Sequence, residues 1–241
     1  MVRASMRDEL SSIIKHLEAL GDPKAVEGMA RYGIVSARAF GVSAGKLREE
    51  AKNLGRNHDL ALKLWPTGIL EARILAALID DPSLVTERQM ERWVKDFDNW
   101  AVCDACCGNL FDRTRFAWDK SVEWSRREAE FVKRAGFVLM AQLAVHDKNA
   151  SDEKFLGFLP LIRRESSDNR NFVRKAVNWA LRQIGKRSAG LNRRAIQTAR
   201  AIRGRHSSSA RWIAADALRE LTSPAVRRRI RDRAKTAAGK R

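Results

Sequence analysis

Five prolines punctuate this chain, and the segments between them carry apolar residues at helical spacing. The prolines are Pro23, Pro66, Pro82, Pro160 and Pro224. The periodic segments run for about 12–20 residues, and none shows the alternation of apolar and polar residues that is typical of a strand. Glycine and proline number only 14 and 5, whereas a sandwich or barrel needs them at its many tight turns. The sequence therefore predicts an all-α protein.

The same periodicity places the expected helices. Asp81 and Ser223 each precede a proline, so we expect both to be N-caps with the proline at the first helical position. The predicted helices cover residues 5–20, 23–32, 43–55, 58–65, 68–80, 83–97, 99–111, 113–119, 127–146, 152–163, 169–186, 190–204, 208–221 and 223–236.

So many short helices favour an α-solenoid of stacked HEAT-like helical pairs over a bundle of a few long helices. No linker is long enough to divide the chain. We therefore expect a single HEAT-like repeat domain over residues 1–241, with basic C-terminal repeats from about residue 187.

Most of the positive charge lies in the last quarter of the chain. The net charge is +18. From Leu181 to Arg241 there are 18 Lys and Arg against three acidic residues, so this segment carries +15 and the preceding 180 residues carry +3. Such a surplus favours a polyanionic partner, which means DNA, RNA or an anionic membrane surface.

Other signals exclude several classes of protein. Cys103, Cys106 and Cys107 are an odd, tightly spaced set, which fits no disulfide framework and indicates a reducing compartment. No histidine is near them, so we interpret them as small buried helical residues and expect no metal and no cofactor. The charged start MVRASMRDELSS is not typical of a signal peptide, and no apolar run reaches the roughly 18 residues of a membrane span. We expect a cytoplasmic protein without a membrane partner.

Trp179 lies off the predicted core face of its helix. At about 100° per residue, Trp179 and Phe172 point well away from the apolar stripe, on the side that also carries Lys175. Such a Trp either stacks under a neighbouring helix, shielded by Lys and Arg stems, or meets a phosphate backbone and stacks on a sugar or base. The stripe itself comprises Val173, Val177, Ala180, Leu181 and Ile184, and the basic residues on the polar side include Arg182 and Lys186.

Trp100 and Asp104 form a second unusual pair. They are four residues apart and so stack on successive helical turns, off the stripe that is made by Val102, Cys103, Cys106 and Leu110. The pair is either part of a functional site or an N-terminal turn with a boundary Trp and an acid that favours the helix dipole.

Arg134 lies in a segment that is apolar almost all round, residues 131–145, and is therefore predicted to be an inner helix. A buried guanidinium is costly unless it is paired. Its partner is either a neighbouring carboxylate or a ligand phosphate.

Together these segments resemble the DNA alkylation repair enzyme family, the AlkD-like glycosylases. The resemblance covers about residues 25–187, and the Lys-Ala-x-x-Trp-x-Leu-Arg run ending at Arg182 is its most specific part. The segments that carry it are Met29-Ala-Arg-Tyr32, Gly41-Val42, residues 46–52, Leu64-Trp65, residues 71–77, Trp100-x-x-x-Asp104, Arg134-Ala and residues 172–182. Three features depart from the family pattern. Asn99 stands where the best-known relatives have an aromatic residue, and the Cys106-Cys107 pair and the basic tail also differ from those relatives.

The resemblance implies a concave basic groove and a monofunctional glycosylase that removes N3- and N7-alkylated purines from double-stranded DNA in base excision repair. It implies that Asp104 is catalytic, that Trp100 and Trp179 contact DNA at the lesion, and that Arg134 supports the site. Tyr32 and Phe172 match DNA-contact positions. It also implies recognition without a base-flipping pocket, and a monomer acting in the bacterial cytosol.

The basic residues of the tail suggest how DNA is held. About six phosphate contacts predict a slope of roughly −5 in a plot of log affinity against log salt. The DNA-binding candidates are Tyr32, Phe172, Lys175, Arg182, Lys186, Arg187, Arg193 and Arg194, with Arg205 as a further tail residue. Two alternatives remain open: a non-catalytic HEAT-like protein that binds damaged or branched DNA, and a HEAT-type scaffold for acidic proteins.

Overall fold

The computed structural model describes residues 6–36 and 38–238, and all regular secondary structure in these residues is helical. This confirms the all-α prediction for the described part of the chain. The residues form two compact units, with the boundary between Arg115 and Phe116. No helix in the described ranges is long and apolar enough to cross a membrane.

Unit 1 is built around α5, which packs against α3, α4 and α7. Its core contains the stacked indoles of Trp65 and Trp93, whose ring centroids lie 3.9 Å apart. The elements of unit 1 are α1 (Met6–Ala19), α2 (Pro23–Met29), η1 (Ala30–Tyr32), α3 (Ala44–Leu54), α4 (His58–Leu64), η2 (Trp65–Thr67), α5 (Leu70–Ile79), α6 (Glu87–Lys95), α7 (Trp100–Asn109) and η3 (Phe111–Arg113).

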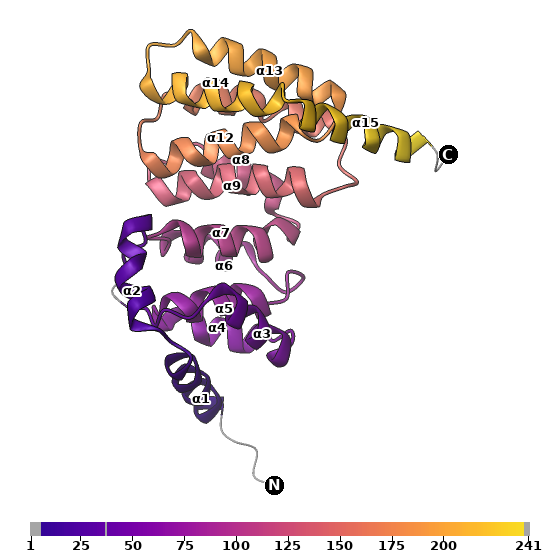
Figure 1. Ribbon diagram of the computed structural model, residues 1–241. Helices are drawn as coiled ribbons and strands as arrows, with labels where there is room; N and C mark the ends of the chain where they lie inside the picture. The colour runs from indigo at the N-terminus through magenta and orange to yellow at the C-terminus, as the bar shows by residue number, and fades with distance from the viewer. Residues whose placement is uncertain (1–5, 37, 239–241) are drawn as a thin grey trace. The chain divides into compact units, whose positions relative to one another are not determined.

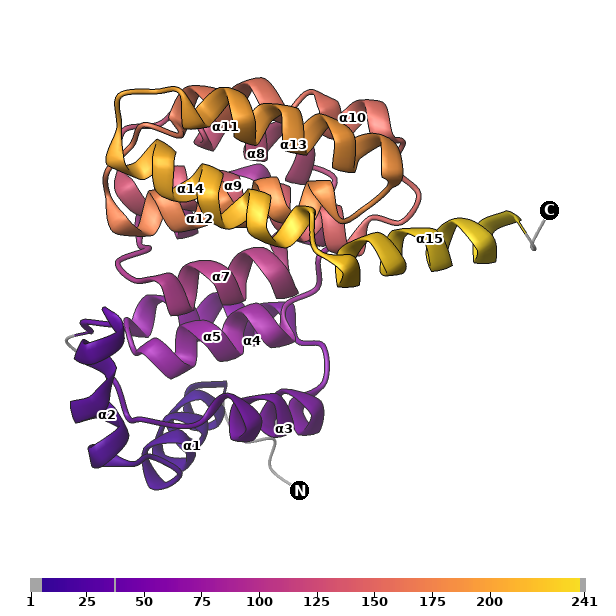
Figure 2. The same ribbon diagram turned by 45° about the horizontal axis from the view of Figure 1, so that its top comes forward.

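Unit 2 has two layers of helices (Figures 1 and 2). Helices α9, α12 and α14 lie side by side in one layer, and α8, α11 and α13 form the other; α15 packs on α14 and projects from the layers. The elements are α8 (Ala117–Trp124), α9 (Glu130–His146), α10 (Asp152–Leu156), α11 (Leu159–Glu165), α12 (Asn171–Gly185), α13 (Ala189–Arg203), α14 (Ser208–Leu221) and α15 (Pro224–Ala238).

Side-chain caps explain where several helices begin. The side chain of Ser223 accepts a hydrogen bond from the Val226 amide at 3.3 Å, which confirms it as the cap of α15. The Asp81 prediction is wrong. Its carboxylate accepts hydrogen bonds from the amide and hydroxyl of Ser83 within a turn, and α6 begins at Glu87 with Thr86 as its cap. Asp and Thr offer the same acceptor chemistry, so the sequence alone did not distinguish turn from cap.

Two other predicted helices differ from the structure. The segment predicted as 152–163 divides into α10 and α11, because the chain turns after Leu156 and Pro160 lies in the first turn of α11, where its missing N–H costs nothing. The segment predicted as 113–119 is displaced, since residues 111–113 form η3 and α8 runs from Ala117 to Trp124.

Candidate nucleic-acid interface

Helix α7 begins at the predicted Trp100–Asp104 pair because Asn99 caps it. The Asn99 side chain is buried and accepts a hydrogen bond from the Val102 amide at 3.0 Å. The residue that departs from the family pattern therefore has a clear local role, since Asn is among the most favourable N-caps. It sets Trp100 as the first residue of the helix.

Trp100 is tied to Tyr32. The indole Nε1 of Trp100 donates a hydrogen bond to the carbonyl oxygen of Tyr32 at 2.8 Å. Tyr32 ends η1 and is followed by Gly33 in a left-handed conformation, and its own side chain is 74% exposed. Unit 1 thus brings two of the predicted DNA-contact residues together, and it leaves the phenol ring open to solvent.

Both residues line a cavity of about 720 Å³ within unit 1. Its walls come from α2, η1, the segment before α3 and the start of α7, and they are mainly apolar, with Met29, Ile34 and Val42 beside the two aromatic rings. The polar lining includes Lys46, whose ammonium group donates to the Leu20 carbonyl at 3.1 Å. An apolar cavity with aromatic rings at its edge suits the flat face of a base or the carbon face of a sugar.

Asp104 lies one turn beyond Trp100 and is half-buried. The predicted stripe of Val102, Cys103, Cys106 and Leu110 is fully buried, as expected, and Asp104 lies outside it. Burial raises the pKa of the Cys107 thiol well above its usual value, and the carboxylate of Asp104 adds a smaller effect of the same sign. The Cys107 thiol is therefore a poorly ionised core group, and the Asp104 side chain lies half-buried at the edge of the core.

Arg134 is buried in unit 2, as its place in an apolar helix predicted, with 6% of its surface exposed. Its Nη1 donates a hydrogen bond to the carbonyl oxygen of Phe172 at 2.7 Å, so this contact is to backbone and differs from both partners weighed in the sequence. The Phe172 ring packs on Phe131 at 5.3 Å between centroids. Arg134 thus fixes the first turn of α12 against α9.

A second buried cation, Lys133, stabilises the same region between α9 and α12. Lys133 Nζ lies 2.7 Å from Glu165 and 3.6 Å from Asp168, and Arg170 pairs with Asp168. Burial alone raises the pKa of Glu165, but the hydrogen bonds and positive charges of Lys133 and Arg164 together lower it below its ordinary value of 4.5. The network holds the loop before α12 and so positions Phe172.

We predict that Glu165→Gln destabilises unit 2 by about 2 kcal/mol at pH 7, because it removes the charged partner of a buried lysine. A carboxyl group whose pKa is lowered by folding stabilises the protein above its unfolded pKa, and this contribution is lost as the pH falls. The difference from wild type should therefore shrink as the pH drops below 4.5. Urea unfolding at pH 7 and pH 3.5 measures it, with Asp119→Asn at an exposed position of α8 as control. A difference that is independent of pH would contradict the assignment.

The exposed side of α12 carries the remaining predicted contacts. The predicted core stripe is completely buried, whereas Phe172 and Trp179 are half-buried and Lys175 is exposed. Positions 172, 175 and 179 follow one another along one face of the helix. The face combines two aromatic rings with a cation, which matches the groups that bind a sugar-phosphate backbone.

Three predicted phosphate ligands make internal contacts instead of standing free. Arg182 pairs with Asp216 and with Glu220, and Lys186 lies 2.7 Å from the same Glu220. Arg187 turns inward: it lies over the Phe155 ring at 4.3 Å and donates a hydrogen bond to the Ala150 carbonyl at 2.6 Å. A role in DNA binding remains a prediction for these residues, and each has to give up or share an internal contact to fulfil it.

The other tail residues lie on α13 or just beyond it. Arg193 and Arg194 are exposed on this helix. Arg205 donates hydrogen bonds to the carbonyl oxygens of Arg163 and Arg164 at 2.6 and 3.2 Å, so it caps the end of α11.

One aromatic candidate escaped the sequence analysis. Trp212 on α14 is 38% exposed, and the guanidinium of Arg174 on α12 lies over its ring at 5.2 Å. The test applied to Trp179 would have found it, because Trp212 lies off the buried stripe of α14 and follows Arg211 in the basic tail.

No group of three or more His, Cys, Asp or Glu in the described ranges has the arrangement of a metal site.

Comparison with known proteins identifies the family. A model of the DNA alkylation repair enzyme family matches residues 13–221. The chain belongs to this family. Two uncharacterized proteins are similar to this chain. One from Listeria innocua is 22% identical and one from Listeria monocytogenes is 21% identical, each over 190 residues that span 77% of this chain and 83% of the relative.

A solved structure has the same fold. It is described as a new family of proteins related to the HEAT-like repeat DNA glycosylases with affinity for branched DNA structures. It aligns with a TM-score of 0.74 at 20% identity and covers 88% of this chain and 95% of that chain. The likeness shows a HEAT-like repeat fold for this member of the DNA alkylation repair enzyme family, and α15 lies beyond the region that the family model matches.

Proposed function

We propose that this chain is a monofunctional DNA glycosylase that hydrolyses the N-glycosidic bond of N3- or N7-alkylated purines in duplex DNA. Membership of the DNA alkylation repair enzyme family supports this. The observation that carries the proposal is the Trp100–Asp104 pair, because Asn99 fixes the ring at the start of α7 and the carboxylate lies outside the buried core.

The chemistry needs few groups. Alkylation at N3 or N7 makes the purine cationic, so the base leaves with the bonding electrons of the glycosidic bond and needs no added proton. Positive charge develops at the sugar as the bond breaks. The Asp104 carboxylate stabilises that charge and accepts a proton from the attacking water, so the products are the free base and an abasic sugar.

The aromatic groups have a complementary role. The indole of Trp100, held by its hydrogen bond to the Tyr32 carbonyl, presents a π-face that attracts a cationic sugar or base. In unit 2, the exposed face of α12 with Phe172, Lys175 and Trp179 holds the phosphate backbone. Recognition through the backbone requires no enclosed pocket for an extruded base.

Release of free base tests the proposal. The full-length protein is incubated with duplex DNA that contains a single 7-methylguanine, and the free base is separated by chromatography. We expect release that increases with time and leaves abasic sites, with none from unmodified DNA. Binding to the duplex without any release would refute the glycosylase function.

A second candidate is a non-catalytic protein that binds branched DNA. The similar HEAT-like structure with affinity for branched DNA favours it. It predicts tighter binding to a four-way junction than to a linear duplex, and no free base from alkylated DNA.

A further inference from the structure

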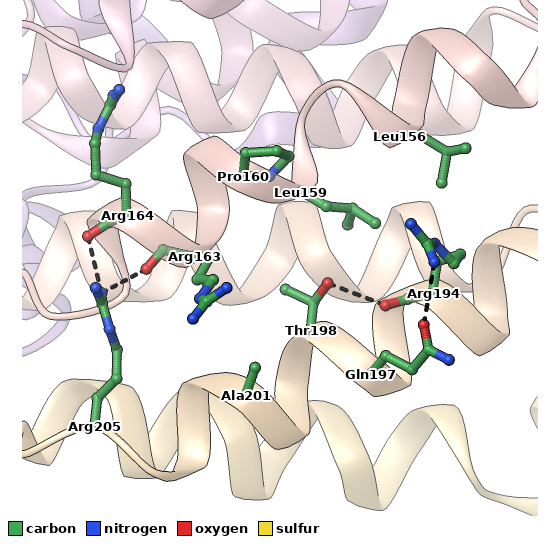
Figure 3. A pocket seen from close by; sticks show the side chains of 10 residues that line it. All are labelled: Leu156, Leu159, Pro160, Arg163, Arg164, Arg194, Gln197, Thr198, Ala201 and Arg205. Atoms are coloured by element: carbon green, nitrogen blue, oxygen red, sulfur yellow. Dashed lines mark hydrogen bonds between the residues drawn. The ribbon is translucent and has the colours of Figure 1, made fainter.

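A second cationic surface lies in unit 2 between α11 and α13 (Figure 3). It is a cavity of about 580 Å³, and none of its lining residues is acidic. Four of the residues are arginines: Arg163, Arg164, Arg194 and Arg205. The others are Leu156, Leu159, Pro160, Gln197, Thr198 and Ala201.

Arg205 forms part of the cavity wall, and its guanidinium is already engaged in internal hydrogen bonds. Its Nη1 donates hydrogen bonds to the carbonyl oxygens of Arg163 and Arg164 (Figure 3). The same Nη1 lies 3.3 Å from the hydroxyl oxygens of Ser166 and Ser167. These contacts hold the end of α11 against the end of α13. The cavity therefore has a defined wall.

Two of the other arginines keep their charge available. Arg163 and Arg194 are exposed, and among the described residues neither has a carboxylate within ion-pair distance. Arg194 only reaches the amide oxygen of Gln197, at 3.5 Å. Arg164, in contrast, pairs with Glu165 at 2.6 Å.

Two basic residues of α12 differ from Arg163 and Arg194 because they are paired with acids. The basic residues Arg182 and Lys186 of α12 are neutralised by Asp216 and Glu220 of α14. Arg163 and Arg194, which have no acidic partner among the described residues, lie on the α11–α13 side. The predicted DNA contacts Phe172, Lys175 and Trp179 belong to the other layer, so the two surfaces are separate.

The floor of the cavity fits a sugar-phosphate backbone. Leu159, Pro160 and Ala201 present short apolar groups between the two guanidinium groups. Guanidinium forks bind phosphate oxygens, and apolar groups pack on the carbon face of deoxyribose. No residue of the lining carries a negative charge that would repel a polyanion.

We propose that the α11–α13 cavity binds the phosphate backbone of a second DNA segment, through Arg163 and Arg194, while the first segment lies on the α12 face. The inference rests on the DNA binding in the proposed function. It adds that one molecule holds two DNA segments, such as two arms of a junction, and it assigns Arg194, which the sequence predicted as a DNA contact, to the second of them.

The test compares two double variants of the full-length protein. Arg163→Ala/Arg194→Ala removes the proposed ligands. Arg200→Ala/Arg203→Ala removes the same charge from exposed positions of α13 that do not line the cavity. Binding is measured to a linear duplex and to a four-way junction with arms of equal sequence, and a second labelled duplex is offered to protein already bound to an immobilised one.

We expect wild type to capture the second duplex. The loss of two phosphate contacts should weaken junction binding by tenfold or more at about 0.15 M salt and reduce the salt slope by roughly 2. Linear-duplex binding should change no more than in the control variant. Equal losses in both variants, or no capture of a second duplex by wild type, would overturn the inference and leave the base-release test unaffected. Failure of wild type to bind linear duplex would refute both proposals.

Discussion

Asp104→Asn should reduce base release from DNA containing 7-methylguanine by about 100-fold or more while leaving DNA affinity almost unchanged. The amide keeps the size of the side chain at its half-buried position on α7 but removes the negative charge. A preorganised charge opposite a developing cation contributes about 3–4 kcal/mol to a transition state, which corresponds to this loss in rate. Single-turnover release at saturating protein measures it.

The control for this variant is Asp59→Asn, which changes an exposed aspartate of α4 in the same unit. It should release base at the wild-type rate. Equal release by wild type and Asp104→Asn would remove Asp104 from the mechanism. Loss of duplex binding in Asp104→Asn, in place of a loss of rate, would assign this residue to binding.

Glu71→Ala should cost unit 1 about 3–5 kcal/mol of its free energy of unfolding. The Glu71 carboxylate is fully buried and accepts hydrogen bonds from the amides of Phe40, Gly41 and Val42 at 3.0, 2.7 and 3.3 Å. Truncation leaves three amide donors without this acceptor, and an unsatisfied buried donor costs about 1–3 kcal/mol. Gly41 has a φ of 83°, and a Cβ there would overlap the Asp22 carbonyl, so the segment cannot easily rearrange.

Urea unfolding followed by tryptophan fluorescence measures this effect, because Trp65 and Trp93 are stacked in the same unit. Glu49→Ala, at an exposed position of α3, is the control and should change stability by less than about 0.5 kcal/mol. Glu71→Gln should fall between the two, since one oxygen still accepts. A Glu71→Ala protein as stable as wild type would show that water or a shifted backbone replaces the carboxylate.

The contact that Glu71 makes could not be derived from the sequence motif that contains it. Glu71 belongs to a segment that carries the family resemblance, and so does Gly41. The structure explains both as parts of one packing arrangement, in which the carboxylate holds the backbone around Gly41. Nothing in the sequence near either residue indicates this contact, because the two lie 30 positions apart.

The sequence by itself determined the all-α class, most of the helices and the direction of side chains around each helix axis. The core stripes of α7 and α12 and the burial of Arg134 were all predictable, because helical geometry and the transfer of apolar groups from water act within a few neighbouring residues. The positive charge of the tail was equally plain from composition.

Only the tertiary structure decided which of those charges remain available. Arg182 lies 34 positions from Asp216 and 38 from Glu220, and Arg134 lies 38 positions from the carbonyl that it binds. Helical periodicity fixes the direction of a side chain but not the identity of the residue on the next helix. The packing of α12 on α14 therefore neutralises cations that the sequence assigned to DNA, while the packing of α11 on α13 leaves Arg163 and Arg194 without acidic partners among the residues described.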